Sequence, residues 1–298
     1  MATPPAPAAS SSEPRVALPA VALALHRMAR SDAAPWLHVE IARRMAERLP
    51  LIRRPVQHVV DWWGFTGGSA AALAAAYPRA RRTIVEPLPA LRARSLEAAR
   101  SIPGAAACST EDRLHADADL VWANMMLHAV ARTEITLSRW HEALATDGFV
   151  MFSAFGPDTA RELRTLYRAS GWGEPGCAFV DMHDLGDQLV RAGFADPVMD
   201  MELLTLTWPD APTLLRELRT MGANVHPQRW PALRTPRWYA ALQAQVQRQL
   251  ASDGGRLALS FEIVYGHAFK AAARRARSQE TGVPLDAVRA MLPTRPKG

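Results

Sequence analysis

Two hydrophobic spacings alternate along the first half of the chain. Short, mostly apolar runs typical of buried strands are separated by longer segments with apolar residues three and four positions apart. This alternation predicts a Rossmann-like α/β fold with a doubly wound, mostly parallel sheet. The expected strands are 57–61, 82–86, 105–108, 119–123 and 149–154, and the expected helices are 36–52, 69–77, 91–101 and 134–145.

The pattern changes after the fifth expected strand. Thr159 and Glu162 have the spacing of a capping box, which predicts a helix from beside Asp158 through Tyr167. Two long runs rich in Leu, Thr and Val predict an antiparallel pair of strands at the sheet edge, with a helical insertion between them. The expected elements are a loop at 171–180, a helix at 184–192, strands at 198–208 and 257–270, and helices at 213–221 and 239–250 within the insertion, 209–256.

Composition sets the limits of the folded domain. The chain has 298 residues and 49% hydrophobic content, enough for one substantial α/β core with additional elements. The amino-terminal residues are rich in Ala, Pro and Ser and contain almost no large apolar side chains, so we expect a disordered tail over 1–20. One folded α/β domain is expected over 21–270, and a basic flexible tail over 271–298.

Several classes of protein are excluded by the same composition. No apolar run approaches the roughly 20 residues of a membrane span, and the apolar run 18–25 lacks the basic start of a secretory peptide. Cys108 and Cys177 have neither metal-ligand nor disulfide-framework spacing, so we expect no metal site and a reducing cytoplasm. The formal net charge of +6 comes without a nucleic-acid recognition motif, and a small acidic protein is compatible with it.

A candidate cofactor turn follows the first expected strand. Residues 59–67 read Val-Val-Asp-Trp-Trp-Gly-Phe-Thr-Gly, and the second strand ends at Glu86. This order suits a nucleoside at the carboxyl ends of parallel strands, where loop glycines allow close backbone approach and an acid binds ribose hydroxyls. We therefore expect cofactor contacts from Asp61, Gly64, Gly67 and Glu86. The turn resembles that of adenosylmethionine-dependent methyltransferases.

Two aromatic residues replace glycines of that pattern. Trp63 and Phe65 stand where the usual turn has Gly, and a bulky residue at positive φ costs on the order of 1–2 kcal/mol. Three arrangements remain open: a reshaped turn that still binds, rings that stack on the ligand, or a closed pocket. The pair Trp62 and Trp63 is also compatible with core packing against the first helix.

A more specific resemblance extends from about residue 22 to 270 and is strongest in the second half. Residues 154–164, Ala-Phe-Gly-Pro-Asp-Thr-Ala-Arg-Glu-Leu-Arg, resemble the segment after strand five in the malonyl-acyl-carrier-protein O-methyltransferases of biotin synthesis. Further segments also resemble this family: residues 181–187, 192–194, 197–200, 214–219, 222–224 and 261–268.

The resemblance implies transfer of a methyl group from S-adenosyl-L-methionine to the free carboxylate of a malonyl thioester on acyl-carrier protein. In the family an Asp after strand three faces the adenine, and the closest match here is Thr110. Asn124 follows strand four where the family has Asn. It is expected to contact the methionyl part of the cofactor or the substrate, with turn capping as the alternative.

The expected chemistry needs few side chains. A malonyl carboxylate is ionised at neutral pH, so no general base is required and the enzyme must align and desolvate the reactants. Arginine suits carboxylate binding in bidentate geometry. We expect substrate or carrier-phosphate contacts from Arg161, Arg164 and Arg219, with solvated helix faces as the alternative. His183 is expected to point into the cleft or to cap its own helix.

Two other functions are compatible with the sequence. The altered turn beside a well-matched second half also suits a catalytically degenerate protein that binds the carrier without methylating it. A methyltransferase for another small carboxylate is the third possibility.

Overall fold

The computed structural model describes residues 15–102, 106–110, 113–222, 224–252 and 254–272. Its sheet has the order β3-β2-β1-β4-β5-β7-β6, in which the first five strands run parallel and β7 is antiparallel to both its neighbours. The predicted doubly wound sheet and its antiparallel edge are therefore confirmed. The strands are β1 His58–Trp62, β2 Arg81–Val85, β3 Ala106–Ser109, β4 Ala118–Ala123, β5 Leu144–Phe155, β6 Ala195–Trp208 and β7 Leu257–Phe269.

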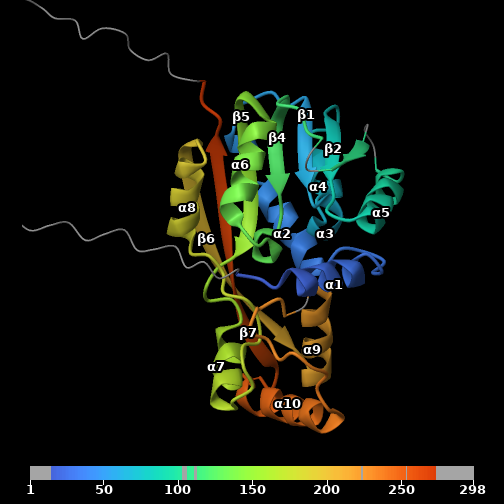
Figure 1. The fold of residues 1–298 in the computed structure, drawn as a ribbon, viewed down its shortest axis with the longest axis vertical. Coiled ribbons are helices and arrows are strands. Elements are labelled where there is room, and N and C mark those ends of the chain that lie inside the picture. Colours follow the sequence, from blue (N-terminus) through green and yellow to red (C-terminus); the bar gives the residue numbers. More distant parts are fainter. Residues whose placement is uncertain (1–14, 103–105, 111–112, 223, 253, 273–298) are drawn as a thin grey trace, which may run out of the picture.

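Helices cover both faces of the sheet (Figure 1). Successive side chains of a strand point to opposite faces, so both faces of the sheet are apolar and need cover. Val60 and Val121 join one apolar cluster, and Val59 and Leu120 join the other. Helices α1, α5, α6 and α8 contribute to the first cluster, and α2 and α4 to the second. The helices are α1 Leu18–Met28, α2 Trp36–Ala46, α3 Gly64–Gly67, α4 Ala70–Ala76, α5 Pro89–Ala99, α6 Thr133–Ala143, α7 Arg161–Ala169, α8 Met182–Arg191, α9 Ala211–Thr220 and α10 Pro236–Gln249, with 3₁₀ turns Leu49–Leu51 and Leu127–Ala129.

The long edge strands carry a second, helical body. Strands β6 and β7 extend past the carboxyl end of β5, where α7, α9 and α10 pack around them (Figure 1). Buried residues from α9, α10 and β7, including Leu214, Val246 and Phe261, form one apolar cluster there. This body lies at the edge of the sheet where the parallel strands end, so it is positioned to complete a site.

The predicted helix after β5 is present as α7, but its predicted capping box is not. Helix α7 begins at Arg161 after Ala160, which is left-handed (φ 54°), and no side chain caps it. Thr159 Oγ1 instead donates to the Glu262 carbonyl, and the Glu162 carboxylate accepts from the amide and hydroxyl of Ser260. The two residues therefore tie α7 to β7. The capping-box spacing was matched by chance.

Helix α3 was not predicted, and α1 lies across the expected boundary of the amino-terminal tail. Val16 is fully buried and α1 begins at Leu18, so the expected boundary at residue 20 falls within a helix. The predicted tail segments 1–14 and 273–298 lie outside the described residues. Within the described part of the chain, no helix has the length and apolar character needed to cross a membrane.

Candidate functional site

Buried polar atoms without partners gather at the carboxyl ends of three adjacent strands. Asp61 is the last residue but one of β1, Glu86 follows β2 and Thr110 follows β3. Both carboxylate oxygens of Asp61, Oε2 of Glu86 and Oγ1 of Thr110 are buried without a hydrogen-bond partner. Unpaired buried polar groups are costly, so a cluster of them is typical of a site that a ligand completes.

Glu86 is only partly satisfied by the chain. Its Oε1 accepts from the Phe65 amide at 2.7 Å and from the Ser95 hydroxyl at 2.6 Å. Burial raises the pKa of Glu86 to about 7, and burial also raises the pKa of Asp61 to about 7. Hydrogen donors from a ligand would stabilise the ionised carboxylates. The amino group and ribose hydroxyls of adenosylmethionine are such donors, so these residues fit that cofactor.

The turn between β1 and α3 keeps the backbone that the sequence pattern requires. Trp63 is left-handed (φ 56°, ψ 46°), the conformation that favours Gly, whereas Phe65 lies inside α3. Strain therefore applies to Trp63 alone. Gly64 is required for packing, because an added Cβ would lie 2.5 Å from Oδ2 of Asp61.

The Trp63 side chain is buried beside helix α1. It is 5% exposed and belongs to the same apolar cluster as Val21, Ala24 and Leu25. These residues line a cavity of about 40 Å³. A space of that size holds a water molecule or two rather than part of a nucleoside. The Trp63 ring therefore closes the turn on its α1 side, while Asp61, Glu86 and Thr110 do not line this cavity.

Asn124 has a structural role in this arrangement. Its Nδ2 donates to the carbonyls of His38 and Gly67, and its Oδ1 accepts from the Ser153 hydroxyl. The residue is fully buried, so its amide is occupied within the chain. These contacts favour the turn-capping alternative over the expected cofactor or substrate contact. Gly67 shares this role, because an added Cβ would lie 3.1 Å from the Asn124 carbonyl.

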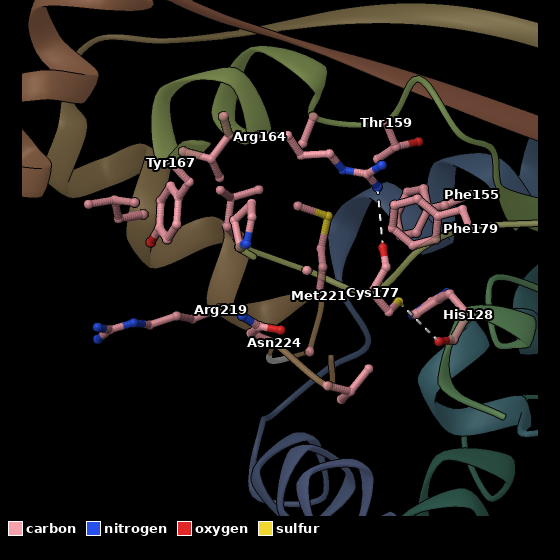
Figure 2. Close-up of a pocket in the computed structure, with 18 of the residues that line it drawn as sticks. His128, Phe155, Thr159, Arg164, Tyr167, Cys177, Phe179, Arg219, Met221 and Asn224 are labelled. Atoms are coloured by element: carbon pink, nitrogen blue, oxygen red, sulfur yellow. Dashed lines mark hydrogen bonds between the residues drawn. The ribbon is translucent and has the colours of Figure 1, made fainter. Parts of the chain in front are cut away.

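A larger pocket of about 310 Å³ lies between the ends of the parallel strands and the helical body (Figure 2). Its wall is mostly apolar and aromatic, with a few polar groups, which is typical of small-molecule sites. The lining residues include His128, Phe155, Thr159, Arg164, Tyr167, Phe179, Leu215, Arg219, Met221, Asn224, Trp238, Tyr239 and Phe261.

Arg164 is the part-buried cation of this pocket. Its guanidinium donates to the carbonyls of Pro157 at 3.2 Å and Cys177 at 3.3 Å, and lies 5.0 Å from the centre of the Phe179 ring (Figure 2). Two of its five N–H groups are thus used. No carboxylate of the described chain pairs with it. Arg164 therefore retains donors for an anionic ligand.

Arg219 reaches the pocket from α9. The side chain is exposed, and its guanidinium lies 5.4 Å from the centre of the Tyr239 ring. In Figure 2 it points away from Arg164, toward the outside of the pocket. It stands at the mouth, where it can meet a ligand that enters.

Two of the four residues expected on the substrate side lie outside the pocket. Arg161 is exposed and pairs with Asp158 and Glu162. The His183 side chain is 80% exposed, and its amide donates to Asp181, which caps α8. Neither residue lines the pocket. Arg161 lies on a solvated face, as its alternative described, whereas Asp181 and not His183 caps α8.

His128 is a residue that the sequence analysis missed. It lines both the large pocket and the small cavity beside Trp63, so it separates the two. Burial lowers its pKa to about 3 and so keeps the imidazole neutral, and its Nδ1 has no partner. Its position four residues beyond Asn124, after β4, is the only sequence signal that could have found it. Tyr167, one turn beyond Arg164, was marked only as a helix end.

Curated proteins provide relatives over most of the chain. The malonyl-[acyl-carrier protein] O-methyltransferase of Laribacter hongkongensis is 36% identical, over 84% of this chain and 88% of that protein. The proteins of the same name from Gallionella capsiferriformans and a Methylovorus species are each 35% identical, over 82% of this chain and 87% and 85% of theirs.

Solved structures agree on the fold. The YcgJ protein from Bacillus subtilis is 11% identical with a TM-score of 0.51, covering 79% of this chain and 98% of that one. A putative methyltransferase from Bacillus halodurans is 12% identical with a TM-score of 0.52, covering 76% and 99%. No family model matches the chain. From its curated relatives, the chain belongs to the malonyl-[acyl-carrier protein] O-methyltransferase family.

Proposed function

We propose that the protein transfers a methyl group from S-adenosyl-L-methionine to the free carboxylate of a malonyl thioester on acyl-carrier protein, an early step of biotin synthesis. The observation that carries this proposal is the apolar pocket with Arg164 inside it, beside strand ends that hold unpartnered acceptors. The names of the relatives favour this reaction over a carrier-binding module without activity.

The cofactor side of the site rests on three residues. The cofactor's polar groups would form hydrogen bonds with three buried groups: Oε2 of Glu86, the carboxylate of Asp61 and Oγ1 of Thr110. When bound, adenosylmethionine supplies an electrophilic methyl group. Because the cavity beside Trp63 is small, we infer that Trp63 and α1 separate when the cofactor enters.

The substrate side needs a cation and an apolar wall that excludes water. Arg164 would hold the malonyl carboxylate through its free N–H groups. The carboxylate is already ionised, so its attack needs no general base. Phe155 and Phe179 exclude water around it, which strengthens the ion pair and removes hydration from the carboxylate. Neutral His128, between the pocket and the turn, would contribute a hydrogen bond without adding a second charge.

Both cysteines are free thiols, in keeping with the reducing cytoplasm that we propose for this protein.

The test is a methyl-transfer assay with labelled adenosylmethionine and malonyl-loaded carrier protein. Label should enter the carrier as a base-labile ester, and succinate or acetate should not replace the malonyl thioester. Unlabelled carrier in the presence of folded protein and cofactor would refute the proposal.

A further inference from the structure

A basic and apolar surface lies beside the mouth of the large pocket. In the segment that leads from α9 into α10, Leu233 is 96% exposed and Trp230 is 53% exposed. Arg229 and Arg237 flank them. We call Arg229, Trp230, Leu233 and Arg237 the docking surface. Large apolar side chains exposed together and rimmed by charge are typical of protein interaction sites.

The segment that carries this surface is basic. Residues 224–252 contain four arginines, at 229, 234, 237 and 248, and no aspartate or glutamate. No carboxylate of the described chain pairs with Arg229 or Arg237, and exposed Arg216 and Arg219 on α9 add to the same sign. Such a field attracts an acidic partner and raises its association rate.

The docking surface is fixed to the pocket wall by stacked side chains. The Arg234 guanidinium lies between the rings of Trp230 and Trp238, at 4.1 and 4.3 Å from their centres. It also donates to the Trp172 carbonyl at 2.7 Å. Trp238 lines the pocket itself. A partner seated on Trp230 is therefore held within a few side chains of the pocket.

We propose that this surface binds an acidic face of the acyl-carrier protein, while the acyl-bearing arm of the carrier enters the pocket past Arg219 toward Arg164. The inference rests on the proposed function and adds the face on which the carrier docks. Leu233 and Trp230 supply the apolar centre of the contact, and Arg229 and Arg237 supply its charged rim.

Direct binding tests the surface without requiring catalysis. Fluorescence anisotropy with labelled, phosphopantetheine-bearing carrier protein should show binding weakened about tenfold or more in the double variant R229E and R237E at low salt. The L233S variant changes a side chain that is already in solvent, so it should fold normally and also bind more weakly. The matched control is Arg79→Glu, at an exposed arginine two residues before β2, which should bind as the wild type does.

Kinetics separate this inference from the proposed function. The ratio of KM for malonyl carrier protein to KM for malonyl coenzyme A should rise about tenfold in the double variant and stay constant in Arg79→Glu. An unchanged ratio together with unchanged carrier affinity would overturn the docking surface while leaving the reaction intact. If wild-type protein methylates neither substrate but binds the carrier through these residues, the proposed reaction fails and the docking surface stands. Absence of carrier binding to the wild type would overturn the docking surface.

Discussion

Replacing Trp63 by glycine tests how the turn admits a cofactor. Trp63 is left-handed, and glycine would relieve about 1 kcal/mol of strain. Removing an indole that is only 5% exposed costs about 3–5 kcal/mol of folding free energy, so the variant should be about 2–4 kcal/mol less stable. Chemical denaturation measures this loss.

Cofactor affinity should move in the opposite direction. Burying a large apolar side chain contributes about 1.5–3 kcal/mol, and opening the turn re-exposes part of the indole before the cofactor can enter. If about half of this burial energy is lost, about 0.75–1.5 kcal/mol, Trp63→Gly should bind adenosylmethionine about 4- to 12-fold more tightly, since 1.4 kcal/mol corresponds to a factor of ten.

Isothermal titration calorimetry provides the measurement, and Phe194→Ala the matched control. Phe194 is equally buried but lies before β6, so its loss should destabilise the fold without changing cofactor affinity. Unchanged or weaker binding by Trp63→Gly would refute the closed turn. Weaker binding in particular would indicate that the indole stacks on the ligand.

Three further predictions concern single side chains. Arg164→Ala should lower kcat/KM about 10- to 100-fold by removing charged hydrogen bonds to the malonyl carboxylate, and Arg164→Lys should restore part of it, as steady-state assays would show. Cofactor affinity, measured by calorimetry, should rise as pH increases through about 7. Burial raises the pKa of Glu86 and Asp61 because it favours their neutral forms, whereas the hydrogen-bond donors of the cofactor favour the ionised forms. Glu86→Gln should bind the cofactor several-fold more weakly and flatten this pH dependence. Asn124→Ala should lower the free energy of unfolding by about 2–4 kcal/mol, measured by denaturation, because it leaves buried groups without partners.

Each of these predictions has a result that contradicts it. Wild-type kinetics in Arg164→Ala would remove that residue from the substrate site, with exposed Arg168→Ala on the same helix as the control. Cofactor affinity that is constant between pH 6 and 8 would show that the strand-end carboxyls do not meet the ligand. Normal stability in Asn124→Ala would contradict its internal role.

The positions of Glu86 and Arg164 could be predicted because they follow from the order of strands and helices. Glu86 ends a strand in a readable strand–helix alternation, so its position at the carboxyl edge follows from the pattern. Arg164 lies on the helix that follows β5, and the local sequence of that segment is enough to predict the helix. The antiparallel edge followed similarly from two long runs.

Other features depend on contacts between distant segments and were not readable. The amide of Asn124 is occupied because α2 and β5 bring His38 and Ser153 to it. His128 matters because two cavities meet at it, and single-sequence periodicity contains no information on cavities. Thr159 and Glu162 matched a local capping pattern, but β7 offered both better partners.

The central claim is that the buried acceptors after β1, β2 and β3 hold adenosylmethionine. Calorimetric titration of the wild-type protein with this cofactor at pH 8 tests it most directly. Saturable binding with one cofactor per chain, weakened in Glu86→Gln, is the predicted result. No heat of binding at millimolar cofactor, from protein shown to be folded, would contradict it.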